Sequence, residues 1–291
     1  MPSPVAILLV GIAVLAAAFV FAWWRSAMAG GHPHRMPSAP QFALGAVTLF
    51  FDTLGIGSYA PTTAAFRFLR MVPDERIPGT LNVGNALPVA LEAFAFIGAI
   101  AVDPLTLLLV VPVGALGGYA GAHVVSQLPR RPIQAGMGLA LLVGATMMFL
   151  TNMQWIPGGG TSIGFAGTTL VLAAALNFVL GALNGLGIGS YAPSLIAFSL
   201  MGMNPRAAFP IMMGSAAYMQ AVAGAKFVRA GTYDGQVALG LTLGGIPGVL
   251  VAAYIIKSLP LDAIRWLVVA VVLYAGISLL RTGMSRRAAR Q

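Results

Sequence analysis

The sequence predicts an all-α integral membrane protein built from two copies of one helical unit, on the strength of three observations. Of the 291 residues, 58% are hydrophobic and only 8% are charged, whereas a soluble domain carries about 25% charged residues. Several apolar runs exceed the roughly 18 residues that a membrane-spanning helix needs. The octapeptide Leu-Gly-Ile-Gly-Ser-Tyr-Ala-Pro occurs twice, at Leu54–Pro61 and Leu186–Pro193, which indicates internal duplication.

Composition also excludes several classes of site. The chain has no cysteine, which excludes a disulfide, a thiolate nucleophile and a Cys-ligated metal. The net charge of +9 lies in short basic clusters between apolar runs, as the positive-inside rule describes, and this argues against nucleic-acid binding. The sequence has no Ser/His/Asp order and no His-Glu-x-x-His run, so we expect no enzymatic activity and no cofactor or metal.

The first apolar segment covers residues 5–24 and belongs, with the polar connector that follows it, to a predicted unit at residues 1–40. It lacks a basic n-region and is longer than the about 7 to 15 apolar residues of a signal peptide, so we expect a retained transmembrane helix. Ala27-Met28-Ala29 resembles a cleavage site and leaves processing as the alternative, against which the preceding Arg25 argues.

Eight further apolar segments follow, and two of them are too long for a single span. The octapeptide interrupts both, and the correspondence continues from Gly84-Asn85-Ala86 to Gly214-Ser215-Ala216. We therefore expect a first repeat at residues 41–151, a second at residues 166–281 and a basic cytoplasmic tail at residues 282–291. The segments are 41–70, 79–101, 104–126, 132–151, 166–202, 207–228, 236–257 and 263–281.

The distribution of Lys and Arg indicates how the two repeats are oriented. If each broken segment enters and leaves on one side, most of the basic loops lie inside, and only Lys257 and Arg265 lie outside. If both broken segments cross the membrane, Arg67, Arg70, Arg76 and the pair Arg130-Arg131 move outside, which fits the rule worse. We therefore favour inverted repeats, each with one re-entrant pair of half-helices and three spanning helices.

The two octapeptides form the candidate substrate site. In each, Gly-Ile-Gly supplies the flexible backbone that a helix break needs, and the proline fits the first turn of a restarting helix. The free N–H groups and the positive end of that helix favour an anion near the membrane midplane. Close helix packing is the alternative role of the glycines. The predicted substrate-binding residues are Gly55, Gly57, Ser58, Tyr59, Gly187, Gly189, Ser190, Tyr191, Asn82, Asn85 and Ser215.

Two carboxylates lie inside predicted apolar segments, where a charge is costly without a partner. Asp52 precedes the first break, and Glu92 shares a helical face with Asn82 and Asn85 by its spacing. Either acid is a candidate to carry a coupling proton. For Asp52 the alternative is helix capping or a structural salt bridge, and for Glu92 it is a structural hydrogen-bond seam.

These residues resemble the TauE/SafE family of sulfite-exporter-like membrane permeases. The resemblance covers nearly everything after the first helix, and it rests on the acid and glycine-rich break at Asp52–Gly57 and on the small-residue helix with Asn82 and Asn85. Two departures are the short glycine run and Asn184, which stands where an acid is frequent in the family. The resemblance implies permeation or export of small anions such as sulfite, sulfonates or related organosulfur compounds.

We therefore expect a secondary transporter of the bacterial inner membrane that moves a small anion by alternating access, driven by a proton gradient or by facilitated flow. Its partners are the anionic substrate and the lipid bilayer, and a homo-oligomer is left open. An anion channel of the same architecture is the first alternative, because helix N-termini and hydroxyls can select an ion without a carrier cycle. A membrane scaffold that transports nothing is the second alternative.

Overall fold

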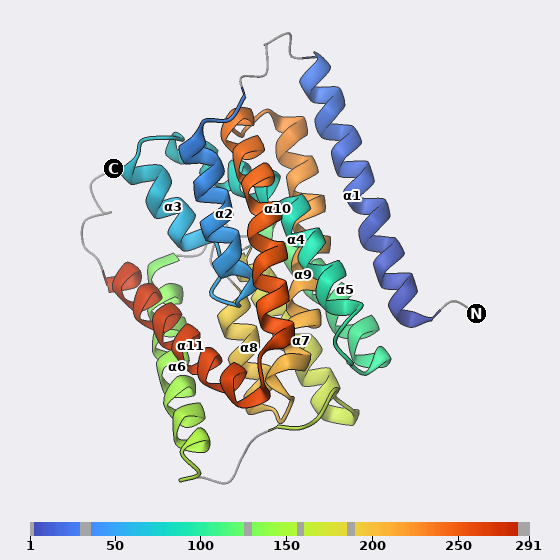
Figure 1. Cartoon of the computed structure of the whole chain (residues 1–291), viewed down its shortest axis with the longest axis vertical. Helices are drawn as coiled ribbons and strands as arrows, with labels where there is room; N and C mark the ends of the chain where they lie inside the picture. Colours follow the sequence, from blue (N-terminus) through green and yellow to red (C-terminus); the bar gives the residue numbers. More distant parts are fainter. Residues whose placement is uncertain (1–2, 30–35, 125–129, 156–159, 185–189, 285–291) are drawn as a thin grey trace.

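The structure is a computed structural model that describes residues 3–29, 36–124, 130–155, 160–184 and 190–284 (Figure 1). These residues form α-helices and one short 3-10 helix, and their only bridge of strand type joins Ser162 to Met203. The fold class is therefore all-α, as predicted. The elements are α1 (Pro4–Ala29), α2 (Ala39–Thr53), α3 (Tyr59–Phe68), η1 (Asp74–Arg76), α4 (Ile77–Ile97), α5 (Pro104–Val124), α6 (Arg130–Asn152), α7 (Gly167–Asn184), α8 (Tyr191–Leu200), α9 (Pro205–Ala230), α10 (Gly235–Ser258) and α11 (Leu261–Met284).

Each of the two long apolar segments is divided into a pair of helices at its octapeptide. In the first, α2 and α3 are separated by a break in which Gly55 has φ +94° and Gly57 has φ +89°. Both angles lie in the left-handed region that glycine adopts without steric strain, so these glycines turn the chain between the helices. In the second segment α7 and α8 are likewise separate, and Gly187 and Gly189 lie outside the described residues.

One end of the bundle, called the first end here, holds the starts of α2, α4 and α10. The backbone N–H of Asp234, just before α10, donates to Thr80 Oγ1 in α4 at 2.9 Å. Gln236 Nε2, in the first turn of α10, donates to the carbonyl of Met36, just before α2, at 3.0 Å. Because α3 leads through η1 directly into α4, the chain returns to this end after the first break.

The opposite end, called the second end, holds the starts of α5, α7 and α9. The backbone N–H of Asp103 donates to the carbonyl of Ile163 at 2.9 Å, and that of Asn204 donates to the carbonyl of Ser162 at 2.8 Å. Because α8 ends only a few residues before Asn204, the chain returns to this end after the second break. Corresponding helices such as α2 and α7 therefore start at opposite ends (Figure 1), and α4 packs against both α9 and α10.

Arg206 corrects the charge count made from the sequence. Its guanidinium donates to the carbonyl of Leu259, which places it at the second end beside the turn from α10 to α11. The sequence reasoning assigned only Lys257 and Arg265 to that side and omitted Arg206, so the count was wrong by one residue. The half-buried side chain is held there by this backbone carbonyl.

The two predicted repeats interlock through their broken segments. Helix α2 packs along α10, and α7 packs along α5. In both pairs glycine allows the backbones to touch: a Cβ added at Gly248 would lie 2.3 Å from the carbonyl oxygen of Ala46, and one added at Gly181 would lie 2.1 Å from that of Gly114. Small residues at such contacts are typical of membrane helix packing. Each first half-helix is thus seated on a helix of the other repeat.

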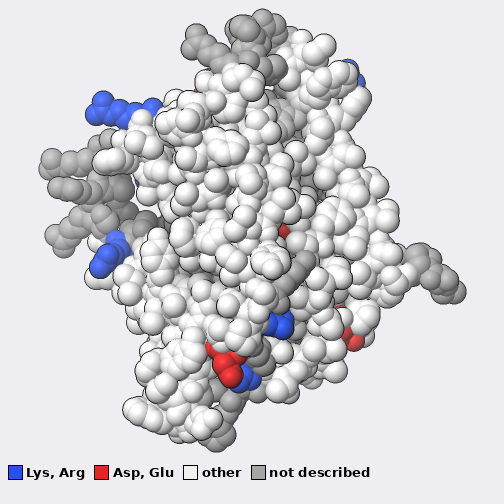
Figure 2. Space-filling view, in the orientation of Figure 1, with Lys and Arg blue, Asp and Glu red and all other residues white. Residues whose placement is uncertain are grey.

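The exterior of the bundle suits a lipid environment. Large apolar side chains such as Val14, Leu116 and Val171 are more than half exposed, and Figure 2 shows a face on which charged side chains are few. Within the described residues, α1, α4, α7, α10 and α11 are long and apolar enough to cross a membrane. The prediction of three spanning helices in each repeat is therefore met only in part by this measure. Of the predicted spans, α4 qualifies in the first repeat and α10 and α11 qualify in the second, while α7, predicted as half of a re-entrant pair, is also long enough to cross.

Candidate functional site

A polar stripe on α4 contacts the first break residue by residue. The stripe consists of Asn82, Asn85 and Glu92, whose spacings of three and seven residues put them on one face of the helix. Asn85 and Glu92 are buried and Asn82 is half-buried. The contacts are Tyr59 OH donating to Asn82 Oδ1 at 3.2 Å, Asn85 Nδ2 donating to Ser58 Oγ at 2.9 Å, and Thr53 Oγ1 at 2.8 Å from Glu92 Oε1.

Asp52 caps the restarting helix α3. Its carboxylate accepts a hydrogen bond from the backbone N–H of Ser58, the residue before α3. A carboxylate at a helix N-terminus meets unpaired N–H groups and the positive end of the helix dipole. Asp52 is only 3% exposed. The position predicted for an anion at the start of α3 is therefore occupied by a carboxylate of the chain itself.

Glu92 joins the two breaks. The side chain is fully buried, and its Oε2 accepts a hydrogen bond from Tyr191 OH at 3.3 Å. Tyr191 is the first residue of α8, whereas Thr53, on the other carboxyl oxygen of Glu92, is the last residue of α2. A single carboxyl group on α4 thus connects the end of α2, before the first break, to the start of α8, after the second break.

The single proton of the Thr53 hydroxyl is shared between two oxygen atoms, and its position depends on the protonation of Glu92. Thr53 Oγ1 lies 2.8 Å from the carbonyl oxygen of Leu49 and 2.8 Å from Glu92 Oε1. A hydroxyl has one proton to donate and two lone pairs with which to accept. When the Thr53 proton goes to the Leu49 carbonyl, which has no proton to offer, the bond to Glu92 requires the carboxyl to be the donor. In that case Glu92 is neutral, and it donates to Thr53 and accepts from Tyr191. In the other case the Thr53 proton goes to Glu92, which then accepts from both Thr53 and Tyr191 as an ionised carboxylate, and the Leu49 carbonyl keeps the helical N–H of Thr53 as its partner.

The second break is less polar than the first. Asn184 stands in the position of Asp52, and its Nδ2 has a long contact of 3.7 Å with Met219 Sδ. Ser190 and Tyr191 are both buried at the start of α8. Ser215, the counterpart of Asn85, accepts from Asn177 Nδ2 at 2.9 Å and donates to the carbonyl of Ile211. Ser215 is therefore held between α7 and α9, in contact with Asn177.

Three polar residues of this region were not among the predicted site residues. Thr53 bridges α2 to Glu92, Asn177 holds Ser215, and Thr62 is fully buried one turn into α3. Each is a polar residue inside an apolar segment, which is a signal that the sequence does contain. The signal is weak for Thr, because threonine often bonds to the backbone of its own helix.

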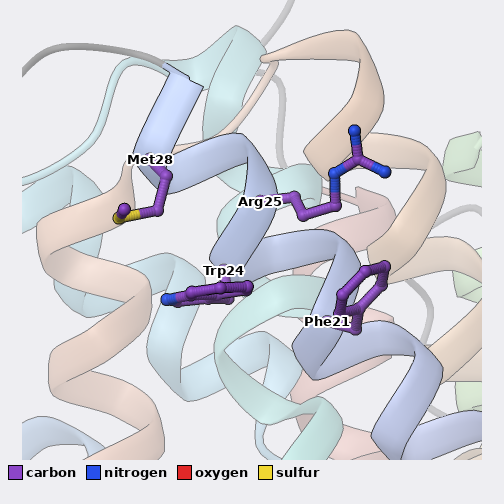
Figure 3. A pocket seen from close by; sticks show the side chains of 4 residues that line it. All are labelled: Phe21, Trp24, Arg25 and Met28. Atoms are coloured by element: carbon purple, nitrogen blue, oxygen red, sulfur yellow. The ribbon is translucent and has the colours of Figure 1, made fainter.

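A surface pocket on α1 lies apart from the two breaks. Figure 3 shows it lined by Phe21, Trp24, Arg25 and Met28, and the Arg25 guanidinium lies 5.8 Å from the centre of the Phe21 ring. Trp and Arg near a helix end are typical anchors at the membrane–water interface. No three of the described His, Asp and Glu residues lie together as a set of metal ligands. The chemistry that the described residues offer is therefore concentrated around Glu92 and Asp52.

The chain matches the family model described as "Sulfite exporter TauE/SafE" over residues 1–148 and 170–291. No curated protein and no solved structure matches it significantly. The match extends across both broken segments, their polar contacts and the first helix, which the resemblance seen in the sequence did not include. The chain therefore belongs to the sulfite exporter TauE/SafE family and is a multi-pass membrane transporter of the kind that exports sulfite and related anions.

Proposed function

We propose that this protein is a secondary transporter of the bacterial inner membrane that exports a small anion such as sulfite or a sulfonate by alternating access. The substrate site lies between the two breaks, and residues 41–151 and 166–281 act as inverted repeats around it. The observation that carries this proposal is the contact of both breaks with one buried carboxyl group, Glu92. A transporter needs an element that senses both halves of its scaffold, and Glu92 has that position.

The helix directions support the inverted arrangement. Helices α2, α4 and α10 start at the first end, while their counterparts α7, α9 and α5 start at the second end. The chain turns back at each break to the end from which it came. Irregular backbone at membrane depth is tolerated where protein covers it, and here the polar stripe of α4 covers the first break. A pair of facing re-entrant segments is a common architecture for transporters.

We place the anion nearer to the second break. At the first break the carboxylate of Asp52 occupies the start of α3 and would repel a substrate anion. At the second break the corresponding residue is the neutral Asn184, and the start of α8 carries Ser190 and Tyr191. Helix N-termini bind anions through their free N–H groups. Glu92 is hydrogen-bonded to Tyr191. It is then close enough to this site for substrate binding to be coupled to the binding or release of a proton by Glu92.

The test is uptake of labelled sulfite and simple sulfonates into proteoliposomes under an imposed pH gradient. We compare the wild type with Asp52→Asn and Glu92→Gln, and use Glu75→Gln, at an exposed acid of η1, as the matched control. Saturable uptake that loses its response to the gradient in Glu92→Gln, with counterflow retained, supports a proton-coupled carrier. Non-saturating flux that ignores the gradient in every protein would indicate a channel and contradict alternating access.

A further inference from the structure

The first break contains a buried carboxylate whose hydrogen-bond partners carry no charge. The hydrogen-bond partner of Asp52 in the described structure is the backbone N–H of Ser58, and the Ser58 hydroxyl acts on the same carboxyl group. Asp52 donates no hydrogen bond within the described residues, whereas a neutral acid would need an acceptor for its proton, so these contacts suit an ionised carboxylate. An ionised group at membrane depth is stable only with a counter-charge or strong coordination. Asp52 therefore calls for a positive partner that the two Ser58 groups do not supply.

Two buried oxygen atoms at the first break are also without a partner. Asn85 Oδ1 and Thr62 Oγ1 are buried, make no hydrogen bond, and belong to residues that are 1% and 0% exposed. Leaving a buried acceptor unpaired is unfavourable, and such groups are few in folded proteins. Both oxygens lie at the same break, one on α4 and one on α3.

The hydrogen bonds of Ser58 connect both residues that carry these oxygen atoms to the residue that contacts the Asp52 carboxylate. Asn85 Nδ2 donates to the Ser58 hydroxyl at 2.9 Å, so Ser58 accepts from the Asn85 amide while its backbone N–H donates to Asp52. The remaining amide atom, Oδ1, is thereby held beside the Ser58–Asp52 pair. The backbone N–H of Thr62 donates to the carbonyl of Ser58 at 3.0 Å, so Ser58 and Thr62 occupy one face of α3 a turn apart.

We propose that Asp52, Ser58, Thr62 and Asn85 form a binding site for one sodium ion at the first break. The site offers oxygen ligands only, which suit a hard cation. One carboxylate balances one monovalent charge, so a bound sodium ion leaves the site neutral in the membrane. The negative end of α2, which stops at Thr53 directly after Asp52, adds to the attraction. Unwound carbonyls and half-helix C-termini are where transporters bind such ions.

The second repeat lacks this site, which predicts a stoichiometry of one. The positions of Asp52, Ser58 and Thr62 correspond to Asn184, Ser190 and Ser194, so the second break has no carboxylate to balance a cation. The titratable groups that act on the first-break cluster are Glu92 and the tyrosines Tyr59 and Tyr191. None of these three contributes a positive charge that could replace the ion.

The test is sodium binding by the purified full-length protein, with no anion and no gradient present. Equilibrium binding of radioactive sodium and the thermal midpoint are measured at one pH while NaCl replaces choline chloride at constant ionic strength. We expect saturable binding of one sodium ion per chain and a rise in the midpoint that choline does not cause. Thr62→Val, which removes only an unpartnered hydroxyl, should weaken the binding at least tenfold, and Asp52→Asn should abolish it.

Thr48→Val is the matched control, because Thr48 is a buried threonine of α2 whose hydroxyl already donates to the carbonyl of Leu44. It should bind sodium as the wild type does. Should Asp52→Asn fail to fold, Thr62→Val decides the question. A midpoint that responds equally to sodium and choline would overturn the proposal, as would unchanged sodium binding in Thr62→Val. Anion counterflow measured in choline medium tests the transporter assignment separately, so the two ideas can fail independently.

Discussion

Replacing Glu92 distinguishes a neutral from an ionised carboxyl at the junction of the two breaks. If Glu92 is neutral, it donates one hydrogen bond to Thr53 and accepts one from Tyr191. Glutamine has the same shape, and it can donate through Nε2 to Thr53 and accept through Oε1 from Tyr191. Glu92→Gln should therefore preserve both contacts, whereas Glu92→Leu removes both and leaves the Tyr191 hydroxyl buried without a partner.

The structure sets the size of the expected difference. A buried hydroxyl left unsatisfied costs about 1–3 kcal/mol, so Glu92→Leu should lower the free energy of unfolding by roughly 2 kcal/mol, less any gain from its apolar side chain. Glu92→Gln should stay within about 1 kcal/mol of the wild type, because neutral hydrogen bonds replace neutral hydrogen bonds. If Glu92 were ionised, both Thr53 and Tyr191 would donate to it, and glutamine would lose one bond to a charged group, worth about 1.5–3 kcal/mol.

The assay is unfolding in mixed micelles with increasing denaturing detergent, at a fixed protein-to-lipid ratio, with both variants and the wild type compared. Glu75→Gln, at an exposed acid, reports the effect of losing a carboxyl at the surface. Equal destabilisation by Glu92→Gln and Glu92→Leu would refute a neutral Glu92 and show that the carboxyl is ionised. Retained stability in Glu92→Gln together with lost response to a pH gradient would separate the structural from the coupling role of this residue.

Three further predictions concern the scaffold. Gly248→Ala should lower the free energy of unfolding by about 1–2 kcal/mol, because its Cβ would lie 2.3 Å from a backbone oxygen of α2 and overpacking costs about 1–3 kcal/mol. Gly235→Ala is the control, since the nearest atom to its Cβ is 3.8 Å away. It should leave the free energy of unfolding nearly unchanged in the same assay. Asp234→Ala should cost about 1 kcal/mol in thermal unfolding, since its carboxylate accepts from Val237 N at the start of α10. Single cysteines introduced at Arg131 and Lys257 of this cysteine-free chain should react with a membrane-impermeant label from opposite sides of inverted vesicles, and labelling of both from one side would contradict inverted repeats.

Local sequence features predicted the elements of the fold well. The octapeptides marked both breaks, because glycine is the residue that adopts the positive φ seen at Gly55 and Gly57. The spacing of Asn82, Asn85 and Glu92 predicted one polar face on α4, since helical periodicity alone determines which residues share a face. The resemblance to the family was confirmed by a family-model match that covers nearly the whole chain.

Other features depend on which helices become neighbours, and no local pattern contains that information. Tyr191 meets Glu92 across 99 positions of sequence, and this contact exists because the start of α8 comes within hydrogen-bonding reach of the Glu92 side chain on α4. Ser215 was expected near the second break by its correspondence with Asn85, but α7 supplies Asn177 as its partner. The first repeat has Gly45 at the position of Asn177, so the two halves form different polar contacts from similar sequences.

The sequence by itself determined the membrane class, the duplication and the positions of the two breaks, because hydropathy, repetition and glycine content are properties of short stretches of chain. Only the tertiary structure decided that Asp52 caps α3, that Glu92 connects both breaks, and that Asn85 Oδ1 and Thr62 Oγ1 remain without partners. Burial and hydrogen bonding are relations between distant residues, and they become definite only when the helices pack.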